Sequence, residues 1–199
     1  MREVEVKGVV ADVAAVRARA EKAGAELVFA GRMEDRRYDM PDGQLASQDR
    51  VLRLRIYRHV DGHRAMLDFK GPASVDRGYK IREEFSTMAD DPDALSAILR
   101  RLGYVVSREI DREIAQYRLA GAMVRFERYP RMDVLLEVEG SPEAIERAIA
   151  ALGLKRSDFN SNRLLDFVER FEARTGLRAA LSDRELADGR DDGDDDLDR

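Results

Sequence analysis

Charged and apolar side chains alternate along several short segments of the chain. In the opening segment MREVEVKG, the charged residues Glu3, Glu5 and Lys7 occupy every second position, and valines fill the two positions between them. Successive side chains of a β-strand point to opposite faces, so the valines can be buried while the three charges share one face. The segment predicts a strand with one charged face, although a strand whose charged face is simply solvated would show the same pattern.

The same alternation recurs in five later segments. VLRLRIY places Arg53 and Arg55 on one face, and MLDFKG does the same with Asp68 and Lys70. The other charged faces hold Lys80, Arg82 and Glu84 in KIREEF, Arg125 and Glu127 in MVRFER, and Glu137 and Glu139 in VLLEVEG. Solvated faces would also carry serine, threonine and glutamine, so the dominance of arginine, lysine and glutamate favours a ligand site.

These strands can close into a barrel with an inverted pattern. Apolar side chains would then point outward beneath a layer of helices, and charged ones inward around a tunnel. Because unpaired buried charge is costly, such a tunnel must hold water, ions or substrate. Arginine presents a planar fork that matches phosphate oxygens, and clustered glutamates present the hard oxygens that Mg²⁺ or Mn²⁺ prefers. The charged faces therefore predict a site for metal and phosphate together.

Helices are expected between and after the strands. Three segments have a capping residue and a terminal glycine. These pairs are Asp12 with Gly24, Asp91 with Gly103, and Ser141 with Gly153; Pro92 and Pro142 follow the last two caps. Residues 163–174 form a further amphipathic pattern, which could cap one end of a tunnel or join a homodimer interface. The stretch from about residue 27 to residue 85 is predicted as strands broken by turns, with Asp61-Gly62 at a hairpin tip.

Length and charge indicate one domain with an acidic end. The 199 residues suit a single domain, predicted to span residues 1–180 and to include the last amphipathic helix. Residues 181–199 are predicted to be an acidic, disordered tail, because they hold nine of the acidic residues and only three basic ones. The net charge of -5 therefore comes from these C-terminal residues and not from the predicted barrel.

The composition also excludes several kinds of chemistry. Without cysteine there is no disulfide, no thiolate nucleophile and no cysteine-bound zinc, which fits a reducing compartment. No apolar run approaches the ~20 residues that span a bilayer, and no signal segment precedes the first strand. We expect a soluble, cytoplasmic protein with no membrane partner.

Five motifs in order resemble the CYTH superfamily, also called triphosphate tunnel metalloenzymes. The first is Glu-x-Glu-x-Lys at residues 3–7, and the last is the distant Glu-x-Glu at residues 137–139, within residues 126–140. Between them lie Tyr38-Asp39 with Pro41, Asp42 and Leu45; Phe69-Lys70-Gly71-Pro72; and residues 79–84, which resemble the class IV adenylate cyclase branch. The similarity runs from about residue 2 to residue 153.

The resemblance implies a fold and a set of site residues. Members form a tunnel that binds a triphosphate and a divalent metal, so an α+β fold is expected, with an eight-stranded antiparallel closed β-barrel and helices packed outside. The implied metal ligands, for Mg²⁺ or Mn²⁺, are Glu3, Glu5, Glu127, Glu137 and Glu139. The implied phosphate-binding residues are Lys7, Arg53, Arg55, Lys70, Arg82 and Arg112. Lys7, Glu5 and Glu139 would be the catalytic residues.

The chain departs from the family pattern at several positions. Glu127 replaces the usual aspartate, and Ile114 stands where a second base often follows Arg112. Residues 130–133 replace a glycine-containing link, and Asn162 stands where tyrosine is usual. These differences bear on which substrate is used more than on the fold.

The leading hypothesis for function is a metal-dependent enzyme acting on a triphosphate. It is most like a class IV adenylate cyclase, which converts ATP to cyclic AMP and pyrophosphate. The alternative is a triphosphatase that hydrolyses tripolyphosphate or a nucleoside or thiamine triphosphate; the absence of tryptophan disfavours thiamine. A second alternative is a polyphosphate- or nucleotide-binding module without turnover. Nucleic acid is a poor candidate partner, because the basic residues alternate with acidic ones.

Three further residue groups have a structural and a functional interpretation. His59 and His63 flank the predicted hairpin tip, where polar residues are expected without a metal. Phe167 and Phe171 are predicted as core contacts instead of a base-stacking pair. Tyr38 can either pack structurally or order Asp39 at the mouth of a tunnel.

Overall fold

A single antiparallel sheet forms the body of the protein. The computed structural model describes residues 2–189. The strands are β1 (Arg2–Val9), β2 (Glu26–Asp39), β3 (Val51–His59), β4 (Gly62–Lys70), β5 (Ser74–Asp76), β6 (Tyr79–Ala89), β7 (Val105–Leu119), β8 (Ala122–Arg128), β9 (Leu135–Glu139) and β10 (Phe159–Asn160). The helices are α1 (Val13–Lys22), α2 (Gln44–Ser47), α3 (Pro92–Arg101), α4 (Pro142–Ala151), a 3₁₀ turn (Arg156–Asp158), α5 (Leu164–Thr175) and α6 (Asp183–Asp188).

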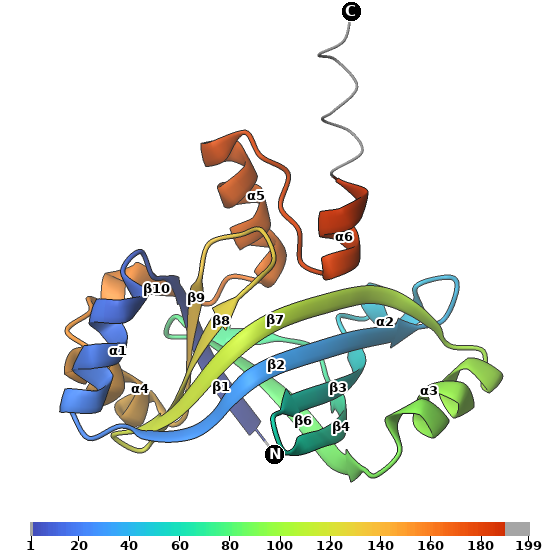
Figure 1. The fold of residues 1–199 in the computed structure, drawn as a ribbon, viewed down its shortest axis with the longest axis horizontal. Helices are drawn as coiled ribbons and strands as arrows, with labels where there is room; N and C mark the ends of the chain where they lie inside the picture. Colours follow the sequence, from blue (N-terminus) through green and yellow to red (C-terminus); the bar gives the residue numbers. More distant parts are fainter. Residues whose placement is uncertain (1, 190–199) are drawn as a thin grey trace, which may run out of the picture.

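Eight of the strands close into a barrel. They follow the order β1-β9-β8-β7-β2-β3-β4-β6, and β6 pairs again with β1 to complete the circle (Figure 1). Each of these pairings is antiparallel, while β5 and β10 extend the sheet beyond the closed part. The expected α+β fold, with an eight-stranded antiparallel barrel and helices outside, is confirmed.

The main hydrophobic core lies between the barrel wall and the helices. Val6, Val124 and Val138 are fully buried on the outer face of their strands and pack with Ile145 and Ile149 of α4. Helix α3 covers a different part of the wall, where Leu99 packs with residues of β2, β3 and β4. Since these apolar residues face outward, the alternate side chains on the same strands face the barrel interior.

The predicted helix signals act as expected. The side chains of Asp12, Asp91 and Ser141 accept hydrogen bonds from backbone amides one turn into their helices. Gly24, Gly103 and Gly153 have positive φ angles just after the helices end, a conformation that side chains with a Cβ seldom adopt. The local sequence therefore places both ends of α1, α3 and α4 correctly.

One short helix interrupts the region predicted as strands and turns. Helix α2 begins at Gln44, five residues after the end of β2, and backbone amides of its first turn donate to the carboxylate of Asp39. The Asp39 oxygens accept from Leu45 and Ala46 at 2.7 and 2.9 Å. Tyr38 is buried, and its hydroxyl donates a hydrogen bond to Ser96 Oγ, so this residue packs structurally. Asp39 is the residue that orders the loop. Four residues are too few to show a helical period in the sequence.

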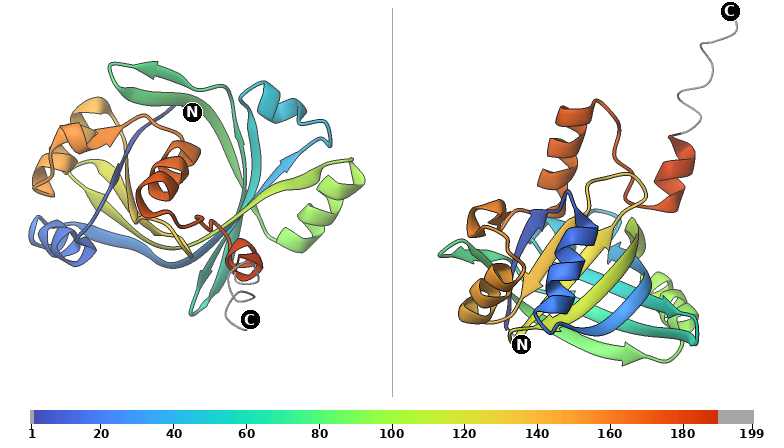
Figure 2. Two further views of the ribbon diagram at one scale, coloured as in Figure 1. Left: turned by 90° about the horizontal axis from the view of Figure 1, so that it is seen from above. Right: turned by 60° about the vertical axis from the view of Figure 1, so that its left-hand side comes forward.

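Helix α5 lies over one open end of the barrel, as the view from above shows (Figure 2). Phe167 packs there with Ile110, Tyr129, Leu135 and Leu181. This position agrees with the first of the two roles expected for the helix, a cap on the tunnel. Phe167 and Phe171 are both buried, as predicted for core residues.

The folded part of the chain extends past the boundary expected at residue 180. Leu181 and Ser182 are buried, and the amide of Asp111 on β7 donates to the Leu181 carbonyl at 2.8 Å. Helix α6 follows, and Arg32 binds Asp183 at 2.6 Å. Several acids of this region are thus structural groups, which a count of charges does not reveal. The prediction of disorder for residues 190–199 lies outside the described residues.

Candidate functional site

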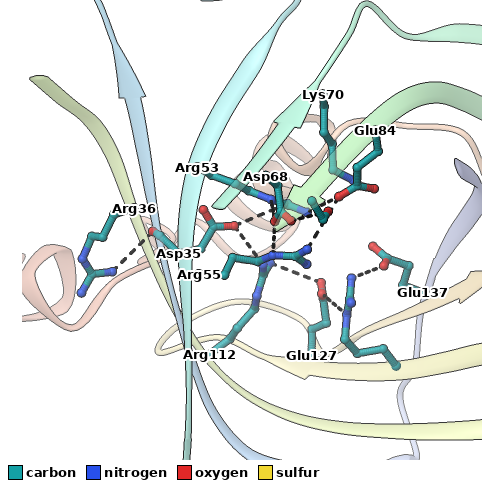
Figure 3. A network of polar contacts seen from close by, with 12 residues as sticks. Asp35, Arg36, Arg53, Arg55, Asp68, Lys70, Glu84, Arg112, Glu127 and Glu137 are labelled. Carbon is teal, nitrogen blue, oxygen red and sulfur yellow. Dashed lines mark hydrogen bonds and ion pairs between the residues drawn. The ribbon is translucent and has the colours of Figure 1, made fainter. Parts of the chain in front are cut away.

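Charged side chains from separate strands meet inside the barrel (Figure 3). Nearly all of the predicted site residues are buried despite their charge. At most 9% of the surface is exposed for Glu3, Glu5, Arg53, Arg55, Lys70, Arg82, Arg112, Glu127 and Glu137. Lys7 and Glu139 are slightly more exposed. Barrel closure therefore brings groups that are far apart in the chain into one interior, such as Glu5 and Glu139, which are 134 positions apart.

A cavity of about 590 Å³ occupies part of this interior. Basic side chains in its lining outnumber acidic ones by about two to one. Of the predicted residues, the lining includes Glu5, Lys7, Arg53, Lys70, Arg82, Arg112, Glu127 and Glu137. Glu3, Arg55 and Glu139 lie outside this lining. The cavity therefore offers an excess of positive charge, which suits an anionic ligand.

Two buried aspartates organise the arginines of β3. Asp35, on β2, lies 3.2 Å from Arg112 and 3.6 Å from Arg53. Asp68, on β4, pairs with Arg53 at 3.0 Å and with Arg55 at 2.5 Å. Burial opposes the charge of Asp35, but Arg53 and its other basic neighbours lower the Asp35 pKa to about 2. Both aspartates remain charged and hold the guanidinium groups in place.

A second acidic group lies where β1 pairs with β9. Glu5 is directly opposite Glu139, and Lys7 is opposite Glu137, with 2.5 Å between Lys7 Nζ and Glu137 Oε2. Burial, Glu137 and Glu3 together raise the pKa of Glu139 to about 7. Among the residues described, Glu139 has no ion pair of its own, whereas Glu3 and Glu5 bind Lys70 and Lys80. Glu139 is thus the one carboxylate of this group without a basic partner in direct contact, among the described residues.

Glu127 is fully enclosed by polar partners. It accepts from Arg125 Nε at 2.9 Å and from the Tyr129 hydroxyl at 2.7 Å, and it lies 3.6 Å from Arg112. Arg125 also contacts Glu137. Burial opposes the charge of Glu127, but Arg112 and Lys7 hold its pKa at about 2. The carboxylate that replaces the family's aspartate therefore orients arginines in this arrangement.

The carboxylates predicted to bind a metal lie inside the barrel, but basic side chains form ion pairs with most of them. Across residues 2–189, no group of three or more acidic or histidine side chains is arranged to hold a metal ion. Most of the predicted ligands instead bind lysine or arginine. Four carboxylates on β1 and β9 still supply the oxygen ligands that Mg²⁺ and Mn²⁺ prefer, and the crowded Glu139 lacks a cation. Binding of a divalent ion by these residues stays a prediction, and it would require their ion pairs to open.

The histidines lie away from this site. His59 pairs with Gly62 across the β3–β4 hairpin, and its side chain is about half exposed. His63 is exposed on the same hairpin. Both lie at the tip, as predicted from the Asp61-Gly62 turn.

Some of the cavity residues received no role from the sequence. Asp35, Arg37, Lys80 and Arg108 all belong to the interior network or the cavity lining. In β2, the run from residue 34 to residue 37 is charged at every position, so alternation does not distinguish the inner from the outer face. Counting from the buried Met33 would have found Asp35 and Arg37, since residues two apart share a face.

One end of the tunnel is filled by apolar side chains. Met33, Tyr57 and Ile114 are buried and pack together, with Phe29 and Met66 against them. Ile114 lies two residues after Arg112 on β7, so both side chains face the interior. The family position that often carries a second base is therefore part of an apolar plug here.

The closed antiparallel barrel and its interior of paired acidic and basic groups define a charged-tunnel protein. Comparison with protein-family models assigns that architecture to a family. The chain belongs to the CYTH domain family, whose model matches residues 1–156. The resemblance inferred from the motifs is thereby confirmed.

Solved structures show the same fold at low sequence identity. A "putative adenylate cyclase" from Vibrio parahaemolyticus is 20% identical, with a TM-score of 0.71, and the match covers 84% of this chain and 97% of that one. A Pyrococcus horikoshii protein is 24% identical, with a TM-score of 0.70 and coverage of 84% and 98%. A "putative adenylyl cyclase" from Hippeastrum, described as having a dominant triphosphatase activity, is 18% identical, with a TM-score of 0.61 and coverage of 90% and 99%.

Two further results are negative, one from comparison with curated proteins and one from the helices themselves. No curated protein matches the chain. Among the helices of residues 2–189, none has the length and apolar character required to cross a bilayer.

Proposed function

We propose that the protein is a divalent-metal-dependent enzyme that binds a triphosphate inside the barrel and cleaves one of its phosphoanhydride bonds. The observation that carries this proposal is the cavity itself, in which an excess of buried basic side chains adjoins the carboxylates of β1 and β9. A triphosphate brings about four negative charges, which several basic groups together can balance. Membership in the CYTH family supports the same class of substrate.

The basic side chains would bind and orient the phosphates. Arg53 and Arg112 are held by Asp35, and Lys7 reaches the interior from the opposite wall, on β1. Lys70 and Arg82 also line the cavity, while Arg55 stands behind Asp68 and supports the network. Guanidinium groups whose positions are already fixed lose little freedom when phosphate binds. The same fixed charges would stabilise the negative charge that develops as a phosphoanhydride bond breaks.

The carboxylates of β1 and β9 would hold Mg²⁺ or Mn²⁺. Glu5 and Glu139 face each other, and Glu3 and Glu137 lie next to them on the same inner faces. A bound divalent ion would neutralise phosphate charge and activate the attacking oxygen. Glu127, which binds Arg112 and Arg125, would orient those arginines.

Ligand binding would require an exchange of ion pairs. In the structure, Lys7 binds Glu137, Lys70 binds Glu3 and Lys80 binds Glu5. Phosphate can replace these carboxylates as the partner of each lysine, which leaves the carboxylates free for the metal. The substrate and the metal should therefore favour each other's binding, because each takes one member of the same ion pairs.

Hydrolysis is the reaction that the cavity supports best. Its lining supplies many groups for phosphates. Among the described lining residues Tyr38 is the one aromatic, and its hydroxyl donates to Ser96 of α3. The lining thus lacks a platform on which a purine could stack. Lys7, which lies next to Glu5 and Glu137, would position the terminal phosphate for attack by water.

Cyclisation of ATP is the second candidate. Residues 79–84 resemble the class IV adenylate cyclase branch, and Lys80 and Arg82 from this segment do line the cavity. Met40, Val105 and Leu165 add apolar surface to the lining, against which a nucleoside could lie. In that case the ribose hydroxyl would attack the first phosphorus and pyrophosphate would leave.

Product analysis separates the candidates. Purified protein is incubated with tripolyphosphate or ATP in Mg²⁺ or Mn²⁺, and the phosphorus-containing products are identified by ³¹P NMR. Orthophosphate from tripolyphosphate supports the hydrolase, and cyclic AMP with pyrophosphate from ATP supports the cyclase. Tight binding of tripolyphosphate without any product would instead show a binding module and contradict the proposed enzyme.

A further inference from the structure

Two arginines of the cavity lie beyond the phosphate-binding residues assigned above. Arg37, on β2, is two residues past Asp35, and Arg108, on β7, is directly opposite it in the strand pairing. Two residues along a strand span roughly 7 Å. Both side chains line the cavity together with Met40, Pro41 and Val105, which lie where β2 ends and β7 begins. The pair therefore lies between Asp35 and this end of the cavity, which we call its mouth.

Neither guanidinium makes a hydrogen bond or an ion pair within the described part of the chain, and the buried Nε of Arg37 has no acceptor. Asp35 attracts Arg37 without forming an ion pair with it. Arg53, Arg112, Arg125, Lys7 and Lys70 are all paired with carboxylates by comparison. Like charges directly opposite each other on neighbouring strands are destabilising. A pair of this kind is expected where a ligand supplies the missing negative charge.

The electrostatic state of Arg37 agrees with this view. Burial lowers the pKa of Arg37 to about 10, and the neighbouring Arg53, Arg112 and Arg108 add to the effect, while Asp35 opposes it. Asp35 itself is shared among several arginines. An anion placed between Arg37 and Arg108 would restore the balance of charge at this point.

We propose that Arg37 and Arg108 form an additional phosphate subsite beside the mouth, so that the cavity accepts a linear polyphosphate of four or more phosphates. This inference rests on the proposed function, since it assumes that the first three phosphates bind deeper, next to Arg53 and Arg112. In the other direction the interior is filled by the apolar plug that contains Met33 and Ile114. A longer chain must therefore extend toward the mouth.

The test compares the affinity of two anions by isothermal titration calorimetry in metal-free buffer that contains a chelator. Wild-type protein should bind tetrapolyphosphate roughly 10-fold tighter than tripolyphosphate, the gain expected from about one charge-assisted hydrogen bond. Arg37→Gln and Arg108→Gln should each reduce that ratio to within about 3-fold and leave tripolyphosphate affinity nearly unchanged. Both arginines are only partly buried, so both variants are expected to fold.

Arg118→Gln is the matched control. It removes one positive charge from the same strand, β7, at an exposed position that binds Glu26. The control should keep the preference for the longer anion, because a general loss of charge does not affect a local subsite. Equal binding of the two anions by wild-type protein, or an unchanged ratio in both cavity variants, would reject the subsite. Failure of wild-type protein to bind either anion, both here and when the titration is repeated in Mg²⁺, would reject the proposed function as well.

Discussion

At the residue scale, Asp35 is the carboxylate on which the basic wall of the barrel depends. It is fully buried and lies between Arg53 and Arg112. Asp35→Asn removes the negative charge and leaves buried arginines without a partner. Loss of one member of a buried ion pair costs about 3–5 kcal/mol, so the free energy of unfolding should fall by that order in urea denaturation. Asp61→Asn, at the exposed hairpin tip, should have almost no effect, and similar stability of the two variants would contradict this role.

Glu139 gives the barrel a measurable dependence on pH. Its folded pKa of about 7 lies above the ordinary value, so the neutral form is favoured by folding. This contribution is fully present below about pH 4.5 and is lost as pH rises through 7. In metal-free buffer, Glu139→Gln should therefore raise the stability at pH 8 relative to wild type, by ~1–3 kcal/mol.

Thermal denaturation between pH 5 and pH 8, in the presence of a chelator, measures this difference. The wild-type protein and the Glu139→Gln variant should be similar at pH 5 and should diverge as pH rises. Glu143→Gln is a suitable control, because Glu143 carries the same charge change on the exposed side of α4. Parallel curves for wild type and Glu139→Gln would contradict a raised pKa of Glu139 in the folded protein.

At the scale of elements, helix α5 is attached to the barrel end mainly through Phe167. This ring packs with Ile110, Tyr129 and Leu135, and Leu181 lies in the same cluster. Phe167→Ala should cost about 3–5 kcal/mol, the range for removing a buried aromatic ring. Hydrogen exchange of α5 should become faster while the strands keep their protection, because α1, α3 and α4 pack elsewhere. Uniform loss of protection across the barrel would contradict an independently attached cap.

Elements with a strong local signal could be predicted from the sequence. Strands β1, β3, β4 and β9 alternate cleanly, and α1, α3 and α4 each have a capping side chain and a glycine at the end. Helix α2 escaped because it has four residues and is held by Asp39, and α6 because its acids resemble a solvated tail. Strand β2 was recognised only as part of a broad region, since residues 34–37 are charged on both faces.

The site residues could be predicted where their strands alternate cleanly between charged and apolar positions. Residues on cleanly alternating strands, such as Glu5 and Arg53, were placed correctly in the interior. Their pairing could not be foreseen, because Arg53 meets Asp35 and Asp68 only after the barrel closes. Arg37 and Arg108 are missing from the sequence-based set because their neighbours on both sides are also charged or polar.

At the scale of the whole molecule, the barrel has its apolar groups outside and its charges inside. Such an interior is stabilised only when every charge has a partner, whether another side chain or a ligand. Metal and substrate should therefore stabilise the fold together. The melting temperature should rise more with tripolyphosphate and Mg²⁺ combined than the sum of their separate effects, since both bind only the folded state. Strictly additive shifts would argue against the exchange of ion pairs.

Calorimetric titration of tripolyphosphate in the presence of Mg²⁺, at a temperature where turnover is slow, tests the central claim most directly. One anion should bind per chain, and Lys7→Gln should weaken binding by at least ~10-fold because Lys7 faces the cavity, while the exposed Arg118→Gln should bind like wild type. Folding of the Lys7 variant is checked by circular dichroism. Absence of binding to the wild-type protein, or equal affinity in all three proteins, would contradict a triphosphate held inside the barrel.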